Sequence, residues 1–288
     1  MADKQGTETS FELSYHQLGA GVDRLLLSGW TCLIVSGGDA GDWLQGQLSN
    51  DVARLGPGEA IRAALLSPTG QMTADVVLCR EEGNYFLLLE RQLLSTVQER
   101  LNRFLIAEDV TLEANGDQID LDIGYSLGAR AEFQWVCGDE KFSARLMDDK
   151  HEPYDESPAL YNLLTLEKHW PLFEKDYTHS TLAMELGDKF IQSRISFDKG
   201  CYVGQEVVHR IYARGHTNKT WVVLKTPTVL DPGATLRSAE GERVGYVTRS
   251  ATSPKHGPIA GVWLPNAYLQ SGAQLTCGST SFQAQPLD

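Results

Sequence analysis

Residues 197–206 read FDKGCYVGQE and are the most unusual stretch of the chain. The two glycines of this stretch, Gly200 and Gly204, permit positive φ angles and a close approach of the backbone to a ligand or to another loop. Cys201 stands between them, two residues after Lys199. Cationic neighbours lower the pKa of a thiol and increase its thiolate fraction. We therefore predict that Cys201 is the reactive cysteine of the chain, with Lys199 as a second candidate for a catalytic role.

The surroundings of Cys201 leave three interpretations open. Three basic or titratable residues that follow it, His209, Arg210 and Arg214, add to the environment that favours a thiolate. Cys201 and His209 also match two members of a cysteine hydrolase site, although no third residue or oxyanion site accompanies them. Free cysteines are often buried as small apolar residues, and the residues alone fit this interpretation equally well. The remaining cysteines have apolar, strand-like contexts, and we expect them in the core: Cys32, Cys79, Cys137 and Cys277.

Charge is distributed unevenly along the 288-residue chain, whose formal net charge is −13. Residues 108–160 carry 14 acidic and 4 basic side chains, which we interpret as a solvated segment. Residues 194–219 form a basic island with five basic and two acidic side chains. Sequence-independent binding to nucleic acid requires many cations to neutralise phosphates, so we expect neither DNA binding nor direct RNA binding. The basic island suits a small anionic ligand instead.

The composition is typical of a soluble globular protein, with 42% hydrophobic and 22% charged residues. Residues 1–10 are polar and lack the apolar core of a signal peptide. No apolar run approaches the roughly 20 residues that cross a bilayer. We therefore expect a cytoplasmic protein without a membrane segment. Five widely spaced cysteines without a Cys-x-x-Cys pattern predict neither a disulfide framework nor a metal site.

The first two thirds of the sequence predict helices mixed with short strands. Asp39 suits the N-cap of a helix that has Trp43 and Leu44 on its apolar face. Apolar runs separated by turn sequences predict a three-strand meander, and a three-and-four spacing of apolar residues predicts the helix that follows. We expect the meander at 60–66, 72–79 and 85–89, helices at 93–105, 160–166 and 181–191, and further strands at 110–112, 119–123, 132–136 and 142–146.

From about residue 221, short strand candidates alternate with turns rich in Gly and Pro, a pattern typical of a small antiparallel β-barrel. These strands are expected at 221–224, 243–248, 259–264, 274–277 and 281–284. Because strands and helices mix without a repeating β-α-β unit, we predict an α+β fold. We expect an α+β domain over residues 1–215, with a meander and helix subdomain at about 55–112, and a β-barrel domain over residues 216–288.

The stretch at 197–206 resembles the signature of the YgfZ family. These folate-binding proteins are related to the T-protein (aminomethyltransferase) of the glycine cleavage system and to a mitochondrial iron–sulfur assembly factor. The similarity continues in LQGQLSNDV at 44–52, in Pro-Thr-Gly at 68–70 and in Arg-Gly at 214–215, so it covers most of residues 25–220. The resemblance implies a T-protein-like folate-binding fold with a C-terminal β-barrel.

The resemblance also assigns residues to the binding of tetrahydrofolate or a related reduced folate. Trp30, in a Trp-(x)6-Gly-x-Asp spacing, and Tyr161, ten residues before Pro171, match positions of aromatic folate contacts. Flat aromatic rings stack on a pterin or aminobenzoyl ring, although core packing is the commoner role of such rings. Glu167 matches a carboxylate that reads the pterin edge through paired hydrogen bonds. Arg214 belongs to the basic island, which suits the glutamate tail.

The family resemblance implies an accessory protein rather than a conventional enzyme. A protein of this type supports assembly or repair of iron–sulfur clusters in client enzymes, including those that modify tRNA, so a folate and such client enzymes are the implied partners. Aminomethyltransferases carry paired acids where this chain has Ala74 and Asp75. The alternative is a tetrahydrofolate-dependent aminomethyltransferase or other one-carbon transferase, in which Asp75 is the polar group near the reacting nitrogen.

Overall fold

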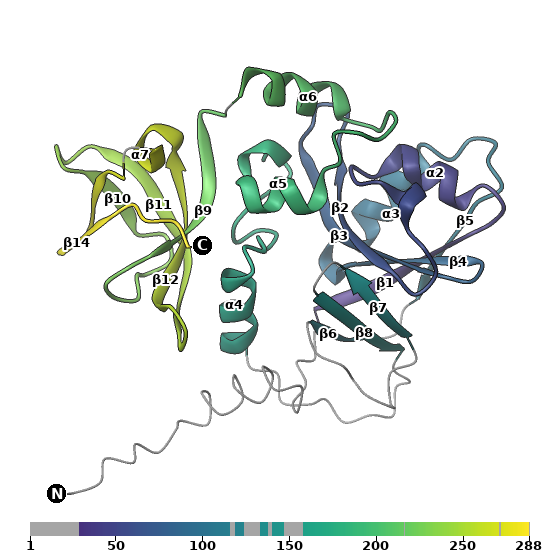
Figure 1. Ribbon diagram of the computed structural model, residues 1–288, viewed down its shortest axis with the longest axis horizontal. Coiled ribbons are helices and arrows are strands. Elements are labelled where there is room, and N and C mark those ends of the chain that lie inside the picture. The colour runs from purple at the N-terminus through teal and green to yellow at the C-terminus, as the bar shows by residue number, and fades with distance from the viewer. Residues whose placement is uncertain are drawn as a thin grey trace, which may run out of the picture.

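The computed structural model describes residues 29–115, 119–123, 133–137, 140–146, 158–215, 217–270 and 272–287. In these ranges the chain forms three antiparallel sheets, and helices lie between the first and the last of them (Figure 1). Helices therefore occur together with antiparallel sheets, as the predicted α+β class requires. Within the same ranges no helix has both the length and the apolar character required to span a membrane.

The predicted meander forms the start of a five-stranded sheet with the order β2-β3-β4-β1-β5. Its strands are β2 (Ala60–Leu66), β3 (Met72–Glu81), β4 (Asn84–Glu90), β1 (Trp30–Ser36) and β5 (Thr111–Asn115). Apolar side chains on the sheet and on the neighbouring helices form the larger hydrophobic core. Helix α2 (Ala40–Gln47) begins after its predicted N-cap, Asp39, and α3 (Leu94–Asn102) follows the short helical turn η2 (Arg91–Leu93). The meander and both of these helices are confirmed.

A three-stranded sheet with the order β6-β8-β7 lies beside the five-stranded sheet (Figure 1). It consists of β6 (Ile119–Ile123), β7 (Phe133–Cys137) and β8 (Glu140–Leu146), each within two residues of its predicted position. Three helices then lead towards the C-terminal sheet: α4 (Pro158–Glu167), α5 (Asp188–Arg194) and α6 (Gln205–Arg214). They occupy the centre of the molecule, between the two larger sheets (Figure 1).

The helix predicted over 181–191 is wrong as a single element. The structure has a short 3-10 turn, η4 (Ala183–Glu185), and then α5, with Gly187 between them. Gly187 has φ 83° and ψ 164°, a conformation that only glycine adopts readily, so the chain changes direction there. Helix α6 was not predicted; it begins directly after Gly204, which has a left-handed conformation.

The C-terminal sheet has six strands in the order β14-β13-β10-β11-β12-β9. They are β9 (Lys219–Lys225), β10 (Thr235–Ser238), β11 (Arg243–Ser253), β12 (Gly257–Pro265), β13 (Gln274–Cys277) and β14 (Thr280–Gln283), with α7 (Asn266–Gln270) after β12. The sheet is antiparallel and curls around its own apolar core (Figure 1). The N–H of Lys225 donates to the carbonyl of Gln285 at 3.0 Å, so the segment after β14 returns to β9. The antiparallel, curled character of the predicted barrel is confirmed, whereas the division into domains at residues 215 and 216 stays a prediction.

Candidate functional site

Lys199 holds the loop that carries Cys201 against the end of helix α2. Its buried ammonium group donates hydrogen bonds to three backbone carbonyl oxygens at 2.6–2.8 Å, those of Gln45, Leu48 and Asn50. The last carbonyls of a helix lack intrahelical donors, so a cation here satisfies them and complements the helix dipole. Burial lowers the pKa of Lys199 to about 8, and the nearby charge of Asp51 opposes this shift. The first function of Lys199 in this structure is to anchor its loop.

The other end of the same loop packs against the turn between β2 and β3. Gly204 has φ 89°, and a Cβ atom at this position would lie 2.6 Å from the carbonyl oxygen of Ser67. The N–H of Val203 donates to the carbonyl of Gly46 on α2 at 3.1 Å. The loop over residues 199–204 is therefore fixed at both ends. Gly204 has the positive φ and the close backbone approach expected of the motif's glycines, whereas Gly200 has neither.

Cys201 is exposed between these two anchors, whereas Cys32, Cys79 and Cys277 are buried. The interpretation of Cys201 as a small buried apolar residue is therefore wrong, and the core positions predicted for the other three are confirmed. Cys137 lies in a strand whose side chains are outside the described part of the structure. The higher reactivity of Cys201 stays a prediction.

Helix α6 carries two basic residues of the predicted island, Arg210 and Arg214. Arg214 lies in its last turn and is exposed. On the same helix, the ring of Tyr212 stacks on Phe197 with 4.0 Å between centroids, and Nε2 of His209 lies 3.3 Å from the side-chain nitrogen of Gln205. The proposed cysteine hydrolase pair gains no third residue from these contacts.

The predicted aromatic pair lies together in the interior. The indole N–H of Trp30 donates to the hydroxyl of Tyr161 at 3.1 Å, which joins β1 to α4. Trp170 packs edge-on against Trp30 with 5.2 Å between ring centroids, and the guanidinium of Arg62 lies 4.2 Å above the Trp170 ring. Burial raises the pKa of Tyr161, so its hydroxyl stays protonated. Trp30 is only 2% exposed, which agrees with the core-packing interpretation of this residue.

Asp75 forms a buried ion pair on the face of the five-stranded sheet that also carries Trp30. Both of its carboxylate oxygens accept hydrogen bonds from Arg194, at 3.1 Å from Nε and 3.0 Å from Nη2. The hydroxyl of Tyr177 accepts the backbone N–H of Asp75 at 3.2 Å. Paired, two-point contacts of this kind are among the stronger hydrogen bonds in proteins. The polar group that the transferase alternative requires is therefore engaged by a cation.

Glu167 is the last residue of α4 and contacts the C-terminal sheet. The hydroxyl of Ser253 on β11 donates to its carboxylate. Glu167 lies six positions after Tyr161, which places it about 9 Å further along the helix axis and on a different face. The structure thus brings Trp30 and Tyr161 together, and places Glu167 at the junction with the C-terminal sheet and Arg214 on the exposed end of α6. The folate-binding roles of these four residues stay predictions.

Three residues of this interior cluster were not predicted from the sequence: Arg62, Trp170 and Arg194. A signal for Arg194 exists, because Asp75 stands within the apolar strand MTADVVL and a buried acid requires a buried cation. The sequence does not say which of the 25 basic residues supplies it. Trp170 has no local signal, since any large aromatic residue fits an apolar core.

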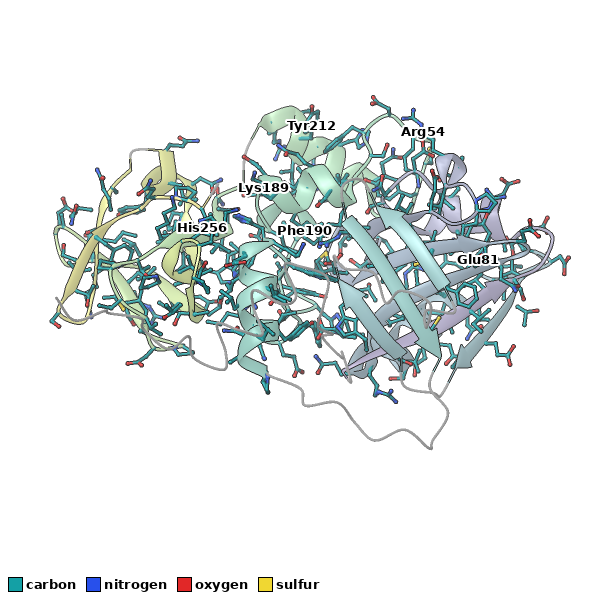
Figure 2. All side chains as sticks on the ribbon, turned by 60° about the horizontal axis from the view of Figure 1, so that its bottom comes forward. Arg54, Glu81, Lys189, Phe190, Tyr212 and His256 are labelled. Atoms are coloured by element: carbon teal, nitrogen blue, oxygen red, sulfur yellow. The ribbon has the colours of Figure 1, made fainter. Side chains whose placement is uncertain are left out.

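A groove of about 1020 Å³ separates α5 and α6 from the C-terminal sheet. The aromatic rings of Phe197, Tyr212 and Trp221 line it together with the buried His169. Figure 2 labels Lys189 and Tyr212, which come from α5 and α6 on one side of this groove. No residue predicted to bind folate or to act in catalysis lines it. Among the described side chains, no group of three or more His, Cys, Asp or Glu residues is placed to hold a metal ion.

The fold is that of a T-protein. The crystal structure of the glycine cleavage system aminomethyltransferase T from Bartonella henselae superposes with a TM-score of 0.71 and covers 92% of this chain and 86% of that chain, at 18% sequence identity. At this identity the likeness defines the class of fold, an α+β protein of the T-protein type.

The sequence itself is similar to YgfZ proteins. The tRNA-modifying protein YgfZ of Cronobacter sakazakii is 23% identical, with 85% of each chain covered. The human mitochondrial iron–sulfur cluster assembly factor is 27% identical over 76% of this chain and 72% of its own length, and an uncharacterized protein of Haemophilus influenzae is 28% identical over 70% and 73%. No protein-family model matches the chain. The chain is therefore similar in sequence to YgfZ proteins and T-protein-like in fold.

Proposed function

We propose that the protein is a folate-binding accessory protein that supports assembly or repair of iron–sulfur clusters in client enzymes, and thereby supports tRNA-modifying enzymes. The observation that carries the proposal is the exposed thiol of Cys201 on a loop that is fixed at both ends. A surface thiol suits a transient contact with iron, sulfur or a redox partner that another protein brings. The relatives support the same role, because they include a tRNA-modifying protein and an iron–sulfur cluster assembly factor.

A reduced folate fits the chemistry of the four predicted contact residues. Trp30 and Tyr161 supply aromatic surface for a pterin or aminobenzoyl ring, Glu167 supplies carboxylate acceptors for pterin N–H groups, and Arg214 suits the anionic glutamate tail. When bound, a reduced folate supplies a carrier of one-carbon units. Because Trp30 is 2% exposed, folate binding requires its ring to become accessible. Binding should therefore change tryptophan fluorescence.

The one-carbon transferase alternative has less support. It requires Asp75 near the reacting nitrogen of the substrate, and both oxygens of this carboxylate accept hydrogen bonds from Arg194. A shared fold with an aminomethyltransferase is compatible with the alternative but does not by itself define chemistry. A turnover assay with an aminomethyl donor and tetrahydrofolate separates the two functions, and we expect no product above the background rate.

Titration of the protein with tetrahydrofolate tests the folate site. We expect saturable binding by calorimetry and by tryptophan fluorescence, and a loss of about tenfold or more in affinity for Trp30→Ala, because the main stacking surface is removed. Trp43→Ala is the matched control, since Trp43 is also buried but its indole N–H donates to the carbonyl of Phe104, away from the predicted folate contacts. Absence of saturable binding up to millimolar tetrahydrofolate would refute the folate site.

Complementation tests the role of the thiol. In a strain that lacks its own homologue, the native protein should restore the activity of iron–sulfur enzymes, and Cys201→Ala should not. Folate affinity should stay unchanged in this variant, because stacking and the Glu167 contact do not use sulfur. Cys201→Ser with a measured unfolding midpoint provides the second variant if the alanine variant is unstable. Full complementation by a folded variant would show that the thiol has no part in the function.

A further inference from the structure

We propose that Lys199 is a positioning residue for Cys201: by binding three carbonyl oxygens at the end of α2 it fixes the exposed thiol at one place on the surface. This inference rests on the proposed function of Cys201. Lys199 lies two residues from the thiol in sequence, its side chain is buried, and Cys201 is exposed. One residue of the motif therefore faces the interior and the other faces solvent.

The hydrogen bonds of Lys199 use all of its donors. An ammonium group has three N–H donors, and its three acceptors lie at 2.7, 2.6 and 2.8 Å. No donor remains for a direct contact with the thiolate of Cys201. A hydrogen-bonding role of Lys199 at the sulfur is thus replaced by a positioning one, in which the lysine determines where the loop lies.

The acceptors of Lys199 belong to a rigid platform. The side-chain amide of Asn50 donates to the carbonyls of Arg62 and Ser193 at 2.7 and 3.2 Å, which ties the segment after α2 to β2 and α5. Ser49 is buried, and its hydroxyl donates to the carbonyl of Arg194 at 2.7 Å. A loop anchored on this segment is therefore held in a fixed position relative to the core of the protein.

The remaining anchors of the loop lie towards its far end. They are the ring of Tyr202, which is buried in the larger core, the N–H of Val203, which donates to Gly46, and the close packing of Gly204 against Ser67. Gly200 has open space where a side chain would be, so no packing at Gly200 replaces the lysine. Loss of the ammonium group should therefore loosen residues 199–203, while Gly204 stays packed against Ser67.

Backbone amide hydrogen exchange of Lys199→Ala tests the anchor without reference to activity. We expect exchange in residues 199–203 to accelerate by tenfold or more, and exchange in β2 and in α6 to stay at native rates. Lys189→Ala is the matched control, because Lys189 is an exposed lysine of α5 (Figure 2) and its loss should leave the loop unchanged. Native exchange rates in the 199–203 loop of Lys199→Ala would overturn the proposal.

Chemical rescue distinguishes an anchor from a general loss of stability. Lys199→Ala leaves a space that matches n-propylammonium, so millimolar n-propylammonium should restore slow exchange in the loop. Tetramethylammonium carries the same charge without an N–H donor and should not. Equal rescue by both cations, or rescue by neither, would overturn the proposal. If Lys199→Ala does not fold, Lys199→Met with the same exchange measurement takes its place.

Complementation then links the anchor to function. In the strain that lacks its own homologue, Lys199→Ala should restore the activity of iron–sulfur enzymes less than half as well as the native protein. In an assay of a client enzyme with the purified variant, n-propylammonium should recover the lost activity. A loosened loop with full complementation would overturn the positioning role. Loss of complementation in Lys199→Ala together with full complementation by Cys201→Ala would refute the proposed function of the thiol and leave the anchor intact.

Discussion

Asp75 and Arg194 show how a single charged residue constrains this interior. Each is at most 4% exposed, and each supplies the partner that makes burial of the other tolerable. Ala74 precedes Asp75 on β3 and, because side chains alternate along a strand, faces the opposite side of the sheet, where it is buried in the larger core. The ion pair therefore accounts for the burial of Asp75 and does not involve the position of Ala74.

Cys201 should alkylate at least about tenfold faster than Cys32, Cys79 and Cys277 at pH 7.5, because only the thiolate reacts and burial suppresses it. Burial raises the pKa of Cys32 to about 12 and also raises that of Cys277. Mass spectrometry after short exposure to iodoacetamide measures the four rates separately. Equal rates for Cys201 and Cys32 in the folded protein would contradict the prediction.

His169 should make the protein sensitive to acid between about pH 6.5 and pH 4. Desolvation, followed by the charge of Lys189, lowers the pKa of His169 to about 4 from an ordinary value of 6.5. In this window the unfolded state binds a proton that the folded state excludes, so the free energy of unfolding decreases as the pH falls, by up to about 3 kcal/mol. His169→Asn keeps a residue that tolerates the positive φ of 51° and removes the titration.

Urea unfolding at intervals between pH 4 and pH 7 measures this contribution. The native protein should lose stability more steeply than His169→Asn as the pH falls. The same slope in both proteins would mean that other groups cause the acid sensitivity.

Elements with strong local signals were predicted well from the sequence. Strand β2 has the predicted bounds, and the turn sequences at 67–71 and 82–83 separate the meander strands as expected. Helix α6 escaped prediction although Val207, Val208 and Ile211 fall on one helical face. Only Val208 among its residues is buried, and three of its ten residues are β-branched, which lowers helix propensity. The four-residue strand β10 is too short to show a period. Local patterns thus predict elements that bury a full face, and they fail where tertiary contacts supply the order.

The same limit applies to the candidate site. The loop motif identified Cys201 and predicted a close approach at its glycines, which holds for Gly204 but not for Gly200. The carbonyl partners of Lys199 are about 150 residues away, and Arg194 is 119 residues from Asp75, so neither contact has a local signature. The roles of Lys199 and Asp75 in the fold therefore required the tertiary structure.

Gly187→Ala should destabilise the protein by about 1–3 kcal/mol, because alanine does not adopt φ 83° with ψ 164° without strain. A Cβ atom at this position would also lie 2.8 Å from the carbonyl oxygen of Trp221. Gly46→Ala is the matched control: Gly46 lies within α2 with open space around its Cα, so the substitution should stabilise by up to about 1 kcal/mol. Equilibrium unfolding in urea measures both changes, and a neutral effect of Gly187→Ala would contradict the strain argument.

At the scale of the whole molecule, one buried network joins the C-terminal sheet to the remainder of the chain. Asp176 accepts hydrogen bonds from Nε of Arg249 on β11 at 2.6 Å and from the indole N–H of Trp221 on β9 at 3.1 Å. The guanidinium of Arg249 also donates to the carbonyl of Trp170 at 2.7 Å and to the hydroxyl of Thr165 on α4. The segment over 170–176 and α4 are therefore tied to the C-terminal sheet by buried charges.

Asp176→Asn should lower the free energy of unfolding by about 3–5 kcal/mol, because it leaves the guanidinium of Arg249 buried without its counter-charge. The double variant Asp176→Leu, Arg249→Met removes both charges, so its loss should be smaller than the sum of the two single losses. Arg237→Met on β10 is the control, since Arg237 is exposed and its removal should change stability by less than about 0.5 kcal/mol. Unfolding followed by far-ultraviolet circular dichroism gives the values for Asp176→Asn, for Asp176→Leu and Arg249→Met singly and together, and for the control. Additive losses in the double variant would show that the two charges do not act as a pair, and the C-terminal sheet would then be held by apolar packing alone.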